Sequence, residues 1–218
     1  LDELERASLR QKLADYIQFE VKSYQNNQLL TYFADDYLLD LFTDTAERSP
    51  TFMLPAFCKC DDRVSPPSWA YVKHLTLDSR AAWDEVFQRP PRCLDWQESD
   101  YEAMDAVRAI AKGLPKISPE ELYKFDVGNG RDPARLRPGN AAILFQVGAA
   151  SEQNLPQFER VAADFEARHV FAVNTAKELA ATPLRLFEHL LVKLVWNTVS
   201  TGTMVLAACL LLPARSHT

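Results

Sequence analysis

Carboxylates lie close together in the segment from Asp35 to Asp40. On a helix, Asp36 and Asp40 project from the same face, one turn apart. Carboxylate oxygens placed in this way can hold Mg²⁺ against a diphosphate group. The spacing therefore supports one hypothesis for this chain, a magnesium-dependent enzyme that acts on a diphosphate substrate through Asp36 and Asp40.

The segment 35–40, with the sequence DDYLLD, resembles the aspartate-rich motif of class I terpene and prenyl synthases. The resemblance covers this segment alone, and it implies an all-helical fold with magnesium held at the motif. Those families also need a second metal-binding motif on a distant helix. The nearest candidate here, Asn174 to Glu178, has a different spacing and a lysine between its polar ends. We therefore favour a solvated acidic helix face over a metal site.

Further candidate metal ligands are Cys58, Cys60, His74 and Cys93. Thiolates and imidazoles bind zinc, but structural zinc sites usually bring two closely spaced pairs of ligands. Only Cys58 and Cys60 form such a pair here, so we expect no metal and no cofactor. Cys209 lies in an apolar run and is expected to be a small buried side chain.

A basic segment later in the chain suggests a different chemistry. Arg131, Arg135 and Arg137 lie in a loop rich in turn residues, whereas acids outnumber bases in the first part of the chain. The loop could bind an acidic partner, RNA phosphates or the acidic end of a second copy. An ordinary solvated loop needs no partner, and the net charge of −6 disfavours unspecific binding to nucleic acid.

The longest uncharged run extends from Leu194 to Leu212. It has about the length that crosses a bilayer, but asparagine, serine and threonine dilute its apolar character. A helix that is apolar on all sides is also typical of the centre of a helical bundle. We consider a buried central helix, a helix covered by a partner and a membrane anchor, in that order of preference. Leu191 and Val195 are the predicted partner contacts on this helix.

Composition limits the class of protein. The chain has 218 residues, of which 47% are hydrophobic and 25% charged, and this suits a single globular domain over residues 1–218. Only six glycines occur, all from Gly113 onward. Phosphate-binding and dinucleotide-binding loops depend on glycine, so Rossmann-type enzymes are not expected. The cysteine usage indicates a reducing compartment, the cytoplasm or the nucleus. The first residue is leucine, which indicates a piece of a longer protein.

The spacing of apolar residues predicts helices through most of the chain. Apolar residues recur at helical spacing from Leu9 to Tyr24 and again from Leu29 to Phe42. Prolines make 48–77 an irregular connection. The segment 141–149 is either a buried helix or the only strand. Further helices are expected over 79–88, 156–181 and 182–212.

These elements predict an all-α fold, a single bundle of about six to eight helices with a proline-rich connection in its first half. The expected function is non-catalytic: a protein-interaction or assembly module, a scaffold whose partner is another protein or a second copy of the chain. One alternative is a helical viral coat or nucleocapsid-like subunit that binds RNA, and the other is the magnesium-dependent enzyme. An intracellular location without membrane contact is expected.

Overall fold

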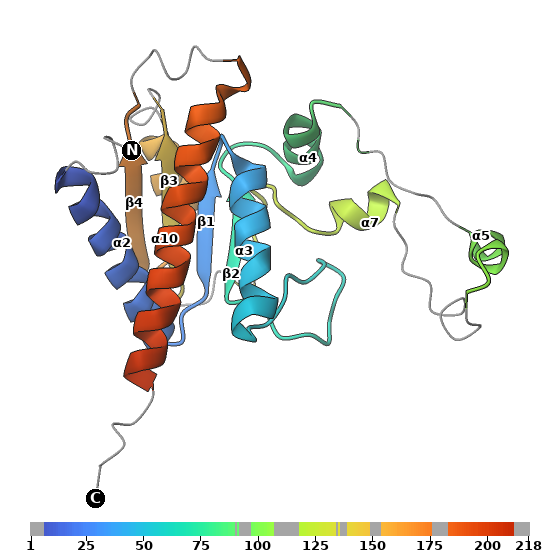
Figure 1. Cartoon of the computed structure of the whole chain (residues 1–218), viewed down its shortest axis with the longest axis horizontal. Helices are drawn as coiled ribbons and strands as arrows, with labels where there is room; N and C mark the ends of the chain where they lie inside the picture. Colours follow the sequence, from blue (N-terminus) through green and yellow to red (C-terminus); the bar gives the residue numbers. More distant parts are fainter. Residues whose placement is uncertain are drawn as a thin grey trace, which may run out of the picture.

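The computed structural model describes residues 7–89, 91, 97–106, 118–133, 135, 139–148, 154–175 and 183–211. Within these residues, four parallel strands form one sheet with helices on both faces (Figure 1). The strands are β1 (Leu30–Ala34), β2 (Ala70–His74), β3 (Ala141–Val147) and β4 (Ala167–Val173). The protein is therefore an α/β fold, and the prediction of an all-α helical bundle is wrong.

The strand order is β2-β1-β3-β4. Helix α3 (Leu38–Phe52) connects β1 to β2, and helix α8 (Leu155–Val161) connects β3 to β4. The two crossovers run in opposite directions along the sheet, starting from the adjacent strands β1 and β3. Because parallel crossovers are right-handed, this reversal puts α3 and α8 on opposite faces, which is the arrangement of a doubly wound sheet.

Two further helices lie beside α3 on one face of the sheet. Helix α2 (Ala7–Gln25) comes first in the chain and α10 (Leu186–Leu211) comes last, and α10 runs between α2 and α3 (Figure 1). Trp196 of α10 is fully buried in this layer. Its ring lies 4.7 Å from that of Tyr32 and 4.9 Å from that of Phe145, both edge-on, so α10 is fixed to β1 and β3 by aromatic contacts.

The remaining described helices are short. They are α4 (Ser79–Phe87), α5 (Glu98–Ala103), α7 (Pro119–Tyr123) and the 3₁₀ turn Pro183–Arg185. Helix α4 begins where the sequence predicts it, because the Asp78 side chain accepts the backbone N–H of Ala81. Helix α5 lies far from the sheet (Figure 1).

Three strands fall where no strand was expected, and burial explains why. All five residues of β1 and all five of β2 are buried. Neither strand therefore shows the alternation of polar and apolar residues that is typical of a strand with one solvent-exposed face. In the predicted helix 156–181, Phe158 and Val161 do lie on α8, but this helix ends at Val161. The chain then enters β4 at Ala167.

The chain turns between strands and helices with little glycine. Tyr37 between β1 and α3 and Gln88 after α4 both adopt left-handed backbone angles, with φ of 59° and 54°. For residues other than glycine this conformation costs about 1–2 kcal/mol. At Tyr37 buried contacts offset the cost, because its ring is buried and its hydroxyl donates to Glu188 at 2.7 Å. Scarce glycine therefore does not exclude a doubly wound sheet.

His169 of β4 gives the fold a predicted pH dependence. Its ring stacks between Tyr16 and Phe19 of α2, and burial lowers its pKa below the ordinary 6.5, with only partial opposition from the charge of Asp15. The unfolded chain takes up a proton near pH 6.5 while the folded protein resists it, so stability falls as the pH drops below that value. In denaturant titrations between about pH 7 and about pH 5, His169→Phe should lose less stability than wild type. Equal losses would contradict this assignment.

Candidate functional site

Helix α10 has an inner face that packs on the sheet. Its buried side chains include Leu191, Val192, Val195, Trp196, Val199, Thr203 and Met204. The partner-binding residues predicted from sequence, Leu191 and Val195, therefore belong to the layer between α10 and the sheet. The helix is not at the centre of a bundle, because only this face is covered by the described residues.

The opposite side of α10 is open to solvent. We define the outer face of α10 as its exposed residues: Leu186, Phe187, Leu190, Leu194, Asn197, Thr198, Thr201, Val205 and Leu206. The exposed fraction is 64% for Leu186, 52% for Phe187 and Leu190, and 53% for Val205. None of these residues is charged. The neighbouring helix α2 presents Arg10, Lys12, Asp15 and Lys22 to solvent, as a helix on the surface of a soluble protein ordinarily does.

The basic side chains that border the outer face are held by α3. Lys193 Nζ donates to Thr43 Oγ1 at 2.8 Å and to Asp44 Oδ1 at 3.1 Å. His189 Nδ1 lies 2.6 Å from Asp40 Oδ2. These contacts turn both side chains toward α3, although Lys193 stays 36% and His189 45% exposed beside the outer face.

The start of α10 is tied to two strand ends through Glu188, which is fully buried. Its carboxylate accepts hydrogen bonds from Tyr37 Oη at 2.7 Å, Thr175 Oγ1 at 2.8 Å and Arg185 Nε at 2.6 Å. Burial alone raises the pKa of Glu188, but these donors outweigh it and leave the pKa below its ordinary value. The ionised carboxylate thus fixes α10 against the segments that follow β1 and β4, and this sets which residues face outward.

Helix α10 is also the segment for which the sequence leaves a membrane anchor as an alternative. Residues Leu186–Ala207 have the length and apolar composition of a span, but 50% of the most apolar window is buried inside the protein. In addition, the middle of the outer face is polar, with Asn197, Thr198 and Thr201 exposed. In a bilayer this part would meet hydrocarbon, where a polar group is costly unless it is hydrogen-bonded. The Thr198 hydroxyl is bonded within the helix, since it donates to the backbone oxygen of Leu194 at 2.8 Å.

Asp36 and Asp40 line a crevice beyond the carboxyl end of β1. The crevice has a volume of about 350 Å³, and α4 and the start of α10 form its other walls. Asp36 Oδ1 accepts from Arg185 Nη1 at 3.1 Å, and Asp40 is bonded to His189. Among the described residues, no group of three His, Cys, Asp or Glu side chains is placed to hold a metal ion. The described part of this crevice therefore lacks the second ligand set that a magnesium-diphosphate enzyme needs.

The candidate zinc ligands are not brought together by the described residues. Cys58 and Cys60 are free thiols that line a separate hollow beside Tyr71. His74 is buried beneath α4, where its Nδ1 accepts the backbone N–H groups of Thr76 and Leu77. Its Nε2 faces Glu85 at 3.4 Å. Cys93 lies outside the described residues.

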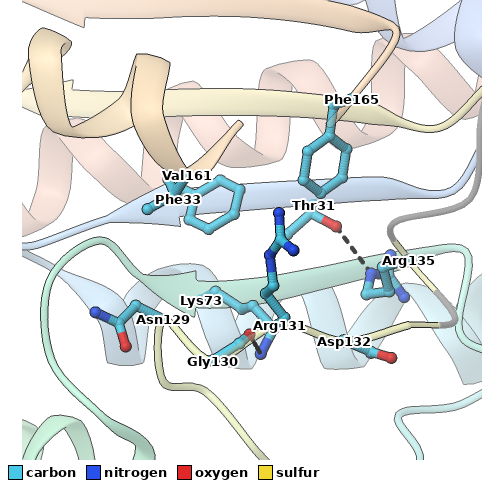
Figure 2. A pocket seen from close by; sticks show the side chains of 10 residues that line it. All are labelled: Thr31, Phe33, Lys73, Asn129, Gly130, Arg131, Asp132, Arg135, Val161 and Phe165. Atoms are coloured by element: carbon cyan, nitrogen blue, oxygen red, sulfur yellow. Dashed lines mark hydrogen bonds between the residues drawn. The ribbon is translucent and has the colours of Figure 1, made fainter. Parts of the chain in front are cut away.

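The described part of the basic loop contains one exposed arginine, Arg131, and one buried arginine, Arg135 (Figure 2). Arg131 is 76% exposed and pairs with Asp164. Arg135 is buried; it donates to Thr31 Oγ1 at 2.9 Å and to the backbone oxygens of Ser68 and Leu30. Arg137 lies outside the described residues.

Arg135 thus holds the loop to β1 and β2, and it is not presented to a partner in this conformation. The pocket between these arginines, Lys73 and the aromatic rings has a volume of only about 20 Å³, which is room for about one water molecule. Figure 2 shows Arg131 extending toward Phe33 and Phe165 over this small space. A phosphate group does not fit in this pocket. Arg131 and Arg135 also line the hollow of about 400 Å³ that contains Cys58 and Cys60.

The sequence identifies α10 but not its outward residues, because a helix that is apolar on all sides gives no periodic signal. The packing of α10 on the sheet determines which of its residues face outward. Comparisons of the chain with protein-family models, with curated proteins and with solved structures find no match.

Proposed function

We propose that the protein is an interaction module that docks an apolar protein surface onto the outer face of α10. The observation that supports this proposal most is the lack of any charged residue on that face between Leu186 and Leu206. A surface helix of a soluble monomer ordinarily carries charged residues there. Contiguous exposed apolar side chains of this kind mark interaction sites.

Burial of these side chains supplies a driving force. Full burial of a leucine or phenylalanine side chain contributes about 1.5–3 kcal/mol, and the four exposed apolar residues of the first half, Leu186, Phe187, Leu190 and Leu194, are each only partly covered now. A partner that covers them would gain several kcal/mol of binding free energy from their burial. The polar middle of the face sets the chemistry of the partner: it must offer hydrogen-bond partners as well as apolar contact, which a protein surface does and lipid does not.

The proposal is tested with the double substitution Leu190→Glu and Leu194→Glu. Its matched control is Gln18→Glu with Gln25→Glu, two exposed positions on α2 that receive the same added charge. Wild type should show one of two signals: association in sedimentation velocity, or, as a free monomer, fluorescence of a bound anilinonaphthalene dye. The double variant should show neither signal and should keep the thermal midpoint of wild type. The control should give the same signal as wild type.

Two results would contradict the proposal. In the first, wild type and the double variant give the same sedimentation and the same dye fluorescence, which means that the outer face binds nothing. In the second, wild type floats with phospholipid vesicles and the double variant does not, which means that the occupant is lipid and not protein.

A further inference from the structure

We propose that the hollow beside Tyr71 binds a small ligand that carries a phosphate group. Its lining includes no residue of α10, so this site goes beyond the proposed function. The hollow has a volume of about 400 Å³, which lies within the range of small-molecule sites. It lies against β2, between the segments 58–68 and 126–135. Tyr71, Pro67 and Pro133 offer apolar contact to the rest of the ligand.

The hollow is lined by a buried cation that has no carboxylate partner. Arg135 is only 3% exposed, and none of the described residues forms an ion pair with it. Its Nε donates to Thr31, its Nη1 to both oxygens of Ser68 and its Nη2 to Leu30, all of which are neutral (Figure 2). Because the guanidinium has five N–H groups, one hydrogen on Nη2 is left without an acceptor.

The charge of Arg135 is therefore poorly compensated. Burial lowers its pKa to about 10, and the charge of Asp132 opposes this shift only in part. A buried charge without a partner is costly. Arg135 is out of reach of a protein surface, but it lines the hollow, so an anion bound there would compensate it.

A second polar group in the hollow also lacks a partner. Tyr71 is 6% exposed, and its ring lies 4.6 Å from that of Phe57 and 5.4 Å from Cζ of Arg135. Within the described part of the chain, its hydroxyl makes no hydrogen bond. Burial raises the pKa of Tyr71, and the charge of Asp126 adds to the shift, so the hydroxyl keeps its proton. It can therefore donate to an oxygen of an anionic ligand.

Two exposed arginines add positive charge at the rim of the hollow. Arg63 forms no ion pair with any residue that the structure describes, and Arg131 pairs with Asp164 at the surface. Exposed ion pairs are weak, so Arg131 can exchange Asp164 for a ligand at little cost. The N–H groups of arginine match the spacing of phosphate oxygens. The hollow thus offers N–H and O–H donors to several oxygens of one phosphate group.

Three carboxylates also line the hollow, and they limit the size of the anion. Asp126 lies 3.3 Å from Nζ of the buried Lys73, and Asp132 interacts with Arg135. Asp62 is exposed, and its carboxylate accepts the backbone N–H groups of two residues that follow it. An RNA backbone, with a charge on every nucleotide, would be repelled by these carboxylates and by the net charge of −6. A single phosphate group on a small molecule is the anion that this arrangement favours.

Ligand-observed NMR with phenyl phosphate as the probe tests the proposal. Wild type should bind it with a Kd of about 1 mM or tighter. Tyr71→Phe removes only the hydroxyl, so it should weaken binding about tenfold, the effect of one hydrogen bond to a charged group. Its thermal midpoint should match wild type, because this hydroxyl has no partner in the described chain.

A charge variant keeps the test independent of Tyr71. Arg63→Gln should weaken binding about two- to fivefold, as expected for an exposed charge. Arg168→Gln is the matched control, because it removes the same charge from β4 at the opposite edge of the sheet. The control should bind phenyl phosphate as wild type does.

Inorganic phosphate and a short single-stranded RNA are titrated beside phenyl phosphate. Weaker binding of inorganic phosphate indicates an organic phosphate ligand, and equal binding indicates free phosphate; both support the site if Tyr71→Phe weakens them. Phenyl phosphate that does not bind at millimolar concentration, or that binds wild type, Tyr71→Phe and Arg63→Gln equally, overturns the proposal. RNA that binds where phenyl phosphate does not also overturns it, in favour of a nucleic-acid surface.

Discussion

An Arg48→Met variant is expected to lose about 3–5 kcal/mol of unfolding free energy, because the substitution leaves a buried carboxylate without its cation. Arg48 of α3 and Glu20 of α2 are both buried, and their side chains approach to 3.3 Å. Arg48 Nη1 also donates to Tyr32 Oη at 2.7 Å, and Tyr32 in turn donates to Glu20 at 2.7 Å. This cluster joins α2, α3 and β1 beneath α10.

Denaturant unfolding followed by circular dichroism measures the loss. Arg131→Met is the control, because Arg131 belongs to an exposed ion pair and should cost at most about 1 kcal/mol. Adding Glu20→Gln to Arg48→Met should recover part of the loss, since the uncompensated charge is then removed. If Arg48→Met is as stable as the control, the cluster does not hold these elements together.

The second large effect concerns Trp196. Trp196→Ala is expected to cost about 3–5 kcal/mol, because the residue is fully buried and its ring contacts Tyr32 and Phe145. Leu194→Ala lies two residues earlier on the outer face, 38% exposed, and should change the stability of the monomer by about 0.5 kcal/mol or less. The measurement is the same denaturant titration, at a dilution where the chain is monomeric. Similar losses for the two variants would mean that α10 presents different residues to the sheet.

The sequence predicts an element well where only one face of that element is buried. Helix α2 is confirmed because Leu9, Leu13 and Tyr16 are buried while the residues between them are mostly exposed. Helix α4 is confirmed by its cap at Asp78. β1 was predicted as part of a helix because Leu30 to Phe33 are buried on both sides, and a continuous apolar run has no period. Only the pairing of β1 with β2 and β3 settles its conformation.

The sequence also does not show which residues of α10 face outward at the candidate site. The sequence predicts that the uncharged run is a helix covered by protein, and it names Leu191 and Val195 as contacts, whereas Leu190 and Leu194 are the exposed residues. The phase of the helix is set by contacts distant in sequence, those of Glu188 with Tyr37 and of Trp196 with Tyr32. Likewise, the sequence around Arg131 and Arg135 does not show which of the two is buried. Arg135 is buried because it donates to the backbone oxygens of Leu30 and Ser68, which are distant in sequence.

Static light scattering and anilinonaphthalene dye fluorescence of wild type beside the Leu190→Glu, Leu194→Glu variant, in buffer without detergent, test the central claim most directly. If the outer face of α10 is an interaction surface, wild type either exceeds the single-chain mass of 24.7 kDa or binds the dye, and the variant does neither. A wild-type mass of 24.7 kDa at every concentration without dye fluorescence, unchanged by the two glutamates, would contradict it.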